Sequence, residues 1–479
     1  MSHMIKTVWL LLAATLAIAT PASAQTTDAS AAGTWSGHIA LPPGPLAISV
    51  TLTRGDGGAW SGTIDIPAQG AHGLKLAPVV VTDPAVSFEI ANVPGQPTFA
   101  GTRSGDRISG TFSQNGGTFR FELGRGAAAA AATAPPRTPR PQEPKPPLAY
   151  TAEDVTYRND AAGVRLAGTL TRPSAGGPFP AVVLISGSGA QDRDETVFNH
   201  KPFLVLADAL TRRGIAVLRS DDRGVGGSDR GPAGPTSKDF AGDVAAAVAY
   251  LETRPDIDRR HIGLIGHSEG GLIAPMVAAS SPDIAFIVLM AGPGVPGDQM
   301  MYLQAAALAR AQGASEALIA WDRSVRQRVY DEVKSETDGV PNAAQREALL
   351  AGAPTLPGVV SEAAARQTTA TILAGASTPW FRFMLTYDPR PTLARVRCPV
   401  LAINGERDTQ VVARENLDAI RSALEAGGNR DVTIEALPGL NHLFQTSTTG
   451  RPDEYESIDE TIAPAALDLI GDWIVKHVQ

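Results

Sequence analysis

The stretch Gly266-His267-Ser268-Glu269-Gly270-Gly271 decides how the rest of this chain is interpreted. It follows the apolar run His261–Ile265 and leads into a helix-like segment, Gly271–Ala279. A strand, a sharp turn and a helix around the pattern G-x-S-x-G predict a nucleophile elbow. The glycines allow a tight backbone that holds Ser268 above the sheet edge, where a base could remove its hydroxyl proton. Ser268 is therefore the predicted nucleophile.

The amino terminus has the features of an export signal. Lys6 precedes the apolar run Val8–Ala14, and Pro21-Ala22-Ser23-Ala24 provides an A-x-A cleavage site. We expect residues 1–24 to be a signal peptide and the mature protein to be periplasmic or extracellular. The apolar run is short for a membrane span, so no stable membrane anchor is expected. The 479 residues exceed one ordinary domain, and two folded units are predicted.

Charge and cysteine content exclude several classes of partner. The formal net charge is −8, and no extended basic run follows the signal segment, so nucleic acid is not an expected partner. The single cysteine, Cys398, permits no internal disulfide. The acids Asp192, Asp194 and Glu195 occur without a nearby histidine pair, so no metal site is predicted. The two glycine-rich segments, at residues 186–189 and 224–227, do not match the nucleotide-binding pattern G-x-G-x-x-G. No cofactor is therefore expected.

Residues 33–124 alternate apolar and polar positions between glycine-rich turns, which predicts short antiparallel strands. A weak repeat of one large apolar residue, one small residue and glycine occurs at Trp35-Ser36-Gly37, Trp60-Ser61-Gly62, Phe99-Ala100-Gly101 and Ile108-Ser109-Gly110. In a small barrel or sandwich these bulky side chains would share one core. An Ala- and Pro-rich segment over residues 125–149 follows and predicts a semi-rigid linker.

From residue 150 to residue 479, strand-like and helix-like patterns alternate. The predicted strands are continuous apolar runs at residues 181–185, 215–218, 262–265, 284–290, 400–403 and 432–434. Such runs suit a mostly parallel sheet covered by helices on both faces. Between about residues 295 and 393 helical patterns alone predict an inserted cap over the carboxyl edge of the sheet. Trp380 and Phe381 of this cap are assigned to substrate binding.

Few histidines are placed to act as the base for Ser268. His442 lies in the loop Leu437–Phe444, after the last predicted strand, where parallel sheets commonly carry functional residues. It is the predicted base. His200 begins a helical segment and is expected to cap or line the pocket, and His267 should point away from its neighbour Ser268.

A carboxylate is needed to fix the tautomer of the base. Asp408 follows the predicted strand 400–403 and completes the chain order Ser, Asp, His. Glu406, earlier in the same turn, is the nearest rival. Backbone amides must also hold the developing oxyanion, and the amide of Glu269 is the first predicted donor. The second should come from Ser186-Gly187-Ser188-Gly189, with Ser188 preferred and Gly187 and Gly189 left open.

Four segments together resemble the α/β-hydrolase superfamily: residues 186–194, 221–228, 266–271 and 440–445. They look like an exported bacterial branch related to the serine-aminopeptidase-like, S33-type hydrolases, whose relatives include carboxylesterases with an additional amino-terminal β module. The resemblance covers about residues 150–479. It implies an α/β-hydrolase fold with a helical cap, preceded by a small antiparallel all-β domain. Ser186-Gly187 departs from the common His-Gly form of the oxyanion segment.

The resulting hypothesis is a secreted serine hydrolase that cleaves small-molecule carboxylic esters through an acyl-enzyme. A second hypothesis is an S33-type aminopeptidase or amidase, which would need an acidic anchor for the substrate ammonium, such as Glu269. A non-enzyme alternative is a glycan- or surface-binding protein in which Trp35 and Trp60 of the β module stack on sugars. Acyl specificity and oligomeric state are open at this level.

Overall fold

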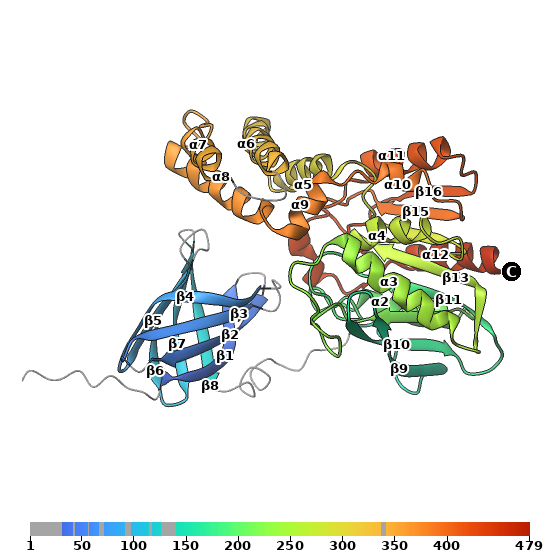
Figure 1. Ribbon diagram of the computed structural model, residues 1–479, viewed down its shortest axis with the longest axis horizontal. Helices are drawn as coiled ribbons and strands as arrows, with labels where there is room; N and C mark the ends of the chain where they lie inside the picture. The colour runs from blue at the N-terminus through green and yellow to red at the C-terminus, as the bar shows by residue number, and fades with distance from the viewer. Residues whose placement is uncertain are drawn as a thin grey trace, which may run out of the picture. The chain divides into compact units, whose positions relative to one another are not determined.

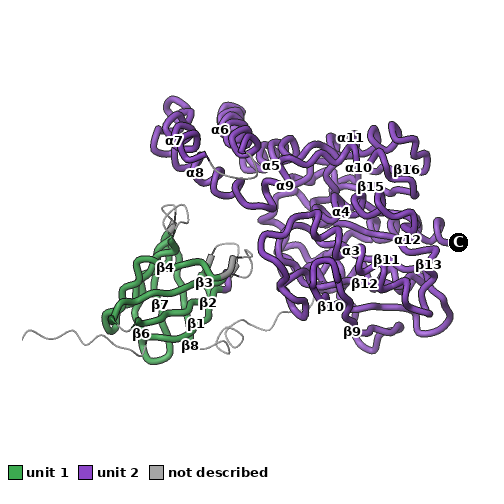
Figure 2. Tube along the Cα trace, in the orientation of Figure 1, with its two compact units in different colours: residues 1–40, 48–65, 73–131 green, residues 41–47, 66–72, 132–479 purple. Residues whose placement is uncertain are grey.

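The structure, a computed structural model, describes most of the chain in two compact units. The described residues are 31–41, 44–55, 57–66, 71–91, 97–114, 117–125, 140–336 and 342–479. One unit comprises residues 1–40, 48–65 and 73–131, and the other comprises residues 41–47, 66–72 and 132–479 (Figure 2). The predicted signal segment 1–24 lies outside the described residues. Among the residues described, no helix has the length and apolar character needed to cross a membrane.

The first unit contains a closed barrel of eight antiparallel strands (Figure 1). Strands adjacent in the sequence are adjacent in the barrel, and the last strand pairs with the first, where Trp35 lies opposite Arg125. Closure leaves no free sheet edge. The expected antiparallel β module is therefore a barrel with these strands: β1 (Gly33–Leu41), β2 (Gly44–Arg54), β3 (Trp60–Ile66), β4 (Ala71–Thr82), β5 (Ala85–Ile90), β6 (Thr98–Ser104), β7 (Arg107–Gln114) and β8 (Gly117–Arg125).

Aromatic side chains fill the barrel. The Phe99 ring lies 4.7 Å from the Phe88 ring and 5.1 Å from the Phe121 ring between centroids, and it is fully buried. Trp35 is also fully buried, and its indole N–H donates to the carbonyl of Ala31 at 2.8 Å. Trp35 is thus a core residue of the barrel. Because its ring is buried, Trp35 cannot stack on a sugar as the glycan-binding alternative requires.

The second unit is built on an eight-stranded mixed sheet with the order β16-β15-β14-β13-β11-β12-β10-β9. The six runs predicted as strands all contribute to it, and they pair in parallel. Two antiparallel strands that were not predicted, β9 and β10, complete one edge. The strands are β9 (Tyr150–Asn159), β10 (Val164–Pro173), β11 (Phe179–Ile185), β12 (Ala216–Ser220), β13 (Ile257–His267), β14 (Ile287–Met290), β15 (Val400–Gly405) and β16 (Val432–Leu437).

Helices cover both faces of this sheet. Successive residues of β11 point to opposite faces, so Val183 packs into one hydrophobic cluster and Val182 into the other. The first cluster includes residues of α3 (Ser237–Glu252), α4 (Glu269–Ala278) and α11 (Ala413–Ala426). The second includes residues of α2 (Pro202–Thr211) and α12 (Pro464–Val478). This doubly covered, mostly parallel sheet confirms the predicted α/β-hydrolase fold.

The insertion predicted over residues 295–393 is helical and lies between β14 and β15 (Figure 1). It has a core of its own around Tyr330 and Leu373, where the buried Glu336 carboxylate pairs with Arg346 and Arg382. A cap with its own core can present side chains to the sheet edge as a unit. Its helices are α5 (Gly297–Ala311), α6 (Glu316–Ser335), α7 (Ala343–Ala351), α8 (Glu362–Ala376), α9 (Pro379–Thr386) and α10 (Arg390–Leu393).

The predicted linker divides into two parts. Residues 126–139 lie outside the described residues. From residue 140 the chain is hydrogen-bonded to the sheet-containing unit: the Gln142 side chain donates to the carbonyl of Ile462 at 2.7 Å and accepts from the amide of Thr461. The Arg140 guanidinium donates to the carbonyl of Glu456 at 2.6 Å. Residues 140–142 are therefore anchored to this unit and do not act as a free spacer.

Candidate active site

Ser268 lies at the sharp turn between β13 and α4, with φ +52° and ψ −115°. A side chain at positive φ is strained, and such strain persists only where the surrounding contacts fix the backbone. Here the amide of Ser268 donates to the carbonyl of Met290 at 2.9 Å, and its carbonyl accepts from the amide of Gly271 at 2.9 Å. The strand, turn and helix expected around Ser268 are all present.

The glycines on either side of Ser268 are required by close backbone contacts. A Cβ atom on Gly266 would lie 2.0 Å from the carbonyl oxygen of Gly270. A Cβ atom on Gly270 would lie 2.1 Å from the carbonyl oxygen of Ile185, at the end of β11. No side chain fits at such distances, so the G-x-S-x-G pattern is explained by packing of the turn against the neighbouring strand.

Asp408 and His442 are in direct contact. Asp408 Oδ2 lies 2.7 Å from His442 Nδ1, and both side chains are buried. The other carboxylate oxygen, Oδ1, accepts the amides of Gln410 at 2.7 Å and Val411 at 2.9 Å. These bonds fix the carboxylate, while Glu406 is exposed to solvent. The geometry therefore favours Asp408 over Glu406 as the partner of His442.

The segments that carry Ser268 and His442 meet through His267. The rings of His267 and His442 lie 4.8 Å apart between centroids, and His267 Nε2 donates to the carbonyl of His442 at 3.0 Å. The oxyanion segment also approaches, because a Cβ atom on Gly187 would lie 3.3 Å from Ser268 Cβ. The Ser268 hydroxyl makes no hydrogen bond to any described residue. In unliganded hydrolases such bonds are often long and shorten only with substrate.

In the oxyanion segment, one backbone amide is already hydrogen-bonded within the protein and others are left free by the described residues. The amide of Gly187 donates to Glu195 Oε1 at 2.6 Å, which excludes Gly187 as an oxyanion donor. Within the described part of the chain, the amides of Ser188, Gly189 and Glu269 have no acceptor. Ser188 and Glu269, the two predicted donors, thus both have free N–H groups.

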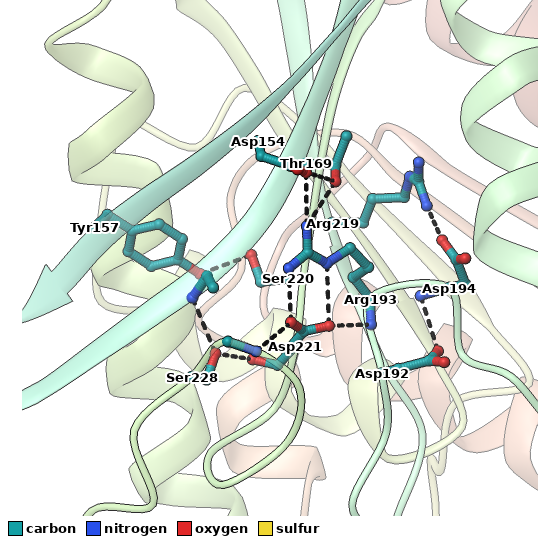
Figure 3. A network of polar contacts seen from close by, with 12 residues as sticks. Asp154, Tyr157, Thr169, Asp192, Arg193, Asp194, Arg219, Ser220, Asp221 and Ser228 are labelled. Carbon is teal, nitrogen blue, oxygen red and sulfur yellow. Dashed lines mark hydrogen bonds and ion pairs between the residues drawn. The ribbon is translucent and has the colours of Figure 1, made fainter. Parts of the chain in front are cut away.

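The loop between β11 and α2 is pinned to the end of β12 by a polar network (Figure 3). The Arg193 guanidinium lies across Asp221, with Nε at 3.1 Å from Oδ1 and Nη2 at 2.7 Å from Oδ2. It also donates to Asp154 at 2.9 Å and Thr169 at 2.8 Å, which come from β9 and β10. A planar guanidinium that makes this many hydrogen bonds fixes the position of the loop relative to the sheet edge. Sequence reasoning did not assign Arg193 or Asp221 any role.

The carboxylate of Asp222, the next residue, holds the same loop by accepting two hydrogen bonds from it. Its Oδ1 accepts the Ser186 hydroxyl at 3.0 Å, and its Oδ2 accepts the amide of Gln191 at 2.9 Å. Burial raises the pKa of Asp222 to about 7, while these two hydrogen bonds oppose the rise and the nearby charges of Glu269 and Glu195 add to it. Ser186, the first residue of the oxyanion segment, and Gln191, two residues beyond its end, are therefore both tied to one carboxylate.

Glu269 connects the elbow to the cap. Its Oε1 accepts the Ser237 hydroxyl at 2.6 Å and the indole N–H of Trp380 at 2.7 Å. Burial raises the pKa of Glu269, and the two hydrogen bonds offset part of that rise. The cap residue Trp380 is thereby held against the carboxylate of Glu269.

A cleft of about 740 Å³ runs between the oxyanion segment and the cap. Trp380 lines it, and its assignment to substrate binding stays a prediction. Phe381 is not among the lining residues and packs inside the cap, with its ring 6.0 Å from that of Tyr330. The cleft walls are Ser188, Gly189, Ala190, Asp222, Arg223, Gly224, Arg230, Pro232, Ala233, Gly234, Pro235, Phe240, Thr378 and Trp380.

His200 does not lie in this cleft. It is 0% exposed, its Nδ1 is 2.9 Å from the Thr461 hydroxyl, and its Nε2 is 2.9 Å from the carbonyl of Tyr455. These partners lie more than 250 positions further along the chain, and no local pattern around His200 reveals them. The expectation that His200 lines the pocket is corrected: it ties the start of α2 to the segment before α12.

Comparison with known proteins adds independent information. Residues 162–434 match the family described as X-Pro dipeptidyl-peptidase (S15 family). The chain is 27% identical over 336 residues to the esterase EstD of Thermotoga maritima, which covers 69% of each sequence.

Two solved structures with similar folds are an esterase of Pyrococcus furiosus and the ferulic acid complex of Est1E from Butyrivibrio proteoclasticus. The first is 16% identical, covers 69% of this chain and 92% of its own, and gives a TM-score of 0.41. The second is 16% identical, covers 68% of this chain and 99% of its own, and gives a TM-score of 0.39.

The family match spans more than half of the chain, including the elbow and the strand that precedes Asp408. The relation to the S33-type branch inferred from sequence motifs stays a prediction. On the strength of the fold and of this match, the chain is an α/β-hydrolase enzyme that belongs to the X-Pro dipeptidyl-peptidase (S15) family.

Proposed function

We propose that this protein is an exported serine hydrolase that cleaves carboxylic esters of small molecules through an acyl-enzyme intermediate. The contact between Asp408 and His442, made where the strands β15 and β16 end, is the observation that carries the proposal. A carboxylate that accepts from one imidazole nitrogen leaves the other nitrogen free to take a proton from a nucleophile. Ser268 is the nucleophile whose segment meets that imidazole through His267.

In the proposed reaction, Ser268 Oγ attacks the acyl carbon while His442 Nε2 removes its proton. His442 then gives this proton to the departing alcohol, and Asp408 stabilises the imidazolium. The amides of Ser188 and Glu269 hold the oxyanion of the tetrahedral intermediate. Water, activated by His442, then releases the acyl group and restores Ser268.

Ester cleavage is favoured over removal of amino-terminal residues because the cleft offers a poor anchor for a substrate ammonium. Glu269 already accepts from Ser237 and Trp380, and both oxygens of Asp222 accept hydrogen bonds. Of the described residues that line the cleft, Asp222 is the only acid, and burial raises its pKa to about 7. The likeness to the esterase EstD points the same way. Amide cleavage remains the second candidate, since the family description names a dipeptidyl-peptidase.

Replacing Ser268 by Ala should abolish labelling by a fluorophosphonate and lower kcat for a p-nitrophenyl ester by about 10⁴-fold or more. The reason is that the acyl-enzyme cannot form without the hydroxyl. Labelling is read by intact-protein mass spectrometry. Ser280→Ala, at the exposed end of α4, is the matched control and should label fully. Full labelling of the Ser268 variant would disprove the assignment.

Asp408→Asn should lower kcat on the order of 10⁴-fold while Glu406→Gln has little effect. Oδ1 of residue 408 must keep accepting the amides of Gln410 and Val411, so the new amide nitrogen would face His442 Nδ1. It would donate there and force the proton onto Nε2, the wrong tautomer for a base. The measurement is kcat for one ester from steady-state kinetics, divided by the number of sites that a fluorophosphonate labels. Equal losses in the two variants would contradict this role.

A substrate comparison separates the two candidate activities. We expect the rate enhancement over uncatalysed hydrolysis to be larger for p-nitrophenyl acyl esters than for p-nitroanilides of Xaa-Pro dipeptides or single amino acids. Initial rates on purified full-length protein, with a graded series of acyl lengths, would also measure how far the cleft accommodates the acyl chain. A preference for the anilides would overturn the esterase proposal.

Export is proposed from the amino-terminal pattern alone. In a bacterial host the mature protein should be recovered from the periplasm or medium with Gln25 as its first residue, as read by mass spectrometry. Ala24→Arg removes the small residue before the cleavage point and should block processing. Recovery of the unprocessed native chain from the cytoplasm alone would refute export.

A further inference from the structure

A buried acid and a buried histidine lie directly beneath the elbow. Glu195 is 3% exposed and His267 is 6% exposed, and Glu195 Oε1 lies 2.9 Å from His267 Nδ1. Glu195 comes from the loop after β11, and His267 is the last residue of β13. The reaction proposed above uses neither side chain.

Each member of this pair also bonds to a backbone group that the reaction needs in place. Glu195 Oε1 accepts the amide of Gly187 at 2.6 Å, directly before the proposed oxyanion donor Ser188. His267 Nε2 donates to the carbonyl of His442, the proposed base, at 3.0 Å. Two side chains thus connect the oxyanion segment, the elbow and the loop of the base.

The hydrogen bonds fix where the protons lie. A carbonyl oxygen only accepts, so His267 Nε2 must carry a hydrogen to bond to His442. Nδ1 faces Glu195 Oε1, which accepts a second hydrogen, and with both nitrogens protonated His267 is a cation. Burial lowers the pKa of His267, but the charge and hydrogen bond of Glu195, with the bond to His442, outweigh burial and raise it above its usual value. The pair is therefore a buried ion pair.

The surroundings contain few other charges. Besides Glu195, the titratable groups that face His267 are His442 and Asp408, from the loops after β16 and β15. Asp222 lies near Glu195, and the small cavity beside the pair is otherwise lined by apolar residues from α2, β14 and the loops near residues 443 and 462: Pro202, Phe203, Met290, Leu443, Phe444 and Ile462. In such a setting the ion pair is only weakly screened by solvent.

The pair is costly to maintain. Glu195 has a positive φ of 50°, and its second oxygen, Oε2, is buried without a hydrogen-bond partner among the described residues. A strained backbone and an unsatisfied buried oxygen each lower the stability of the fold. Asp192 supports the strained turn, since its carbonyl accepts the amide of Glu195 and its side chain accepts the amide of Thr196.

We propose that Glu195 and His267 act as one positioning unit, which sets the oxyanion amides and the base loop against Ser268 through Gly187 N–H and the His442 carbonyl. This inference rests on the proposed serine hydrolase function. Neither residue touches the substrate. When the unit is lost, Ser188 N–H and the His442 ring shift relative to Ser268, so transition-state stabilisation falls while ground-state binding in the cleft persists.

The test uses Glu195→Gln, His267→Gln and the double variant in the full-length protein. The glutamine at 195 keeps the size of the side chain and an oxygen for Gly187 N–H, but it removes the charge that keeps His267 doubly protonated. We expect kcat per fluorophosphonate-labelled site to fall about 10- to 100-fold, with KM changed less than about 2-fold. The double variant should be no slower than the slower single variant, because the two residues act together.

The pH dependence of kcat provides a second measurement, which a general loss of folding stability would not change. Because the pKa of His267 is raised, its second proton is present below that raised value and is lost as pH rises through it. Wild-type kcat should therefore hold to higher pH than kcat of Glu195→Gln, whose alkaline limb moves to lower pH. His267→Gln should lack this limb.

Glu336→Gln is the matched control, since it removes an equally buried, cation-paired carboxylate from the core of the cap. It should lower the melting temperature yet keep kcat per labelled site and the alkaline limb. The inference is overturned if Glu195→Gln keeps both wild-type values, or if the losses in the double variant multiply. Failure of wild-type Ser268 to label would instead refute the proposed function, and so the two failures are distinguishable.

Discussion

The carbonyl oxygen of Ile185 occupies the position where a side chain on residue 270 would begin. This contact brings the end of β11 against the elbow. It places the oxyanion segment, which follows Ile185, beside the strained backbone of Ser268. The proposed oxyanion hole depends on it, because amides on two separate segments can converge on one oxyanion only if those segments touch.

Buried carboxylates then hold the loops at this edge by accepting backbone amides. Asp222 accepts from Gln191, Glu195 from Gly187, and Asp408 from Gln410 and Val411. Hydrogen bonds to carboxylates are stronger than neutral ones, and each also satisfies an amide that would otherwise be buried without a partner. The loops are thus preorganised before substrate arrives, which is what electrostatic stabilisation of a transition state requires.

Structure could be predicted from the sequence where it depends on residues that are close together in the chain. The elbow could be predicted because its glycines and Ser268 lie within a few positions, and the pairing of Asp408 with His442 because each lies in the loop after a predicted strand. Strands β9 and β10 escaped prediction because neither has a continuous apolar run: β9 alternates buried and exposed residues, and β10, although largely buried, is interrupted by Gly168 and by threonines. Glu195 and His200 depend on partners far along the chain, so nothing local revealed the ion pair of the first or the burial of the second.

The indole N–H of Trp380 donates to the carboxylate of Glu269, the residue that follows Ser268, so the positions of the cap and of this side chain are thermodynamically linked. A movement of α9 that withdraws the indole would leave the Glu269 carboxylate with one donor in place of two. By reciprocity, whatever favours the cap position seen here also favours the present orientation of the Glu269 carboxylate, and the reverse holds with the same free energy. A ligand that displaces Trp380 would therefore release the side chain next to Ser268, so occupancy of the cleft and the state of the elbow are coupled.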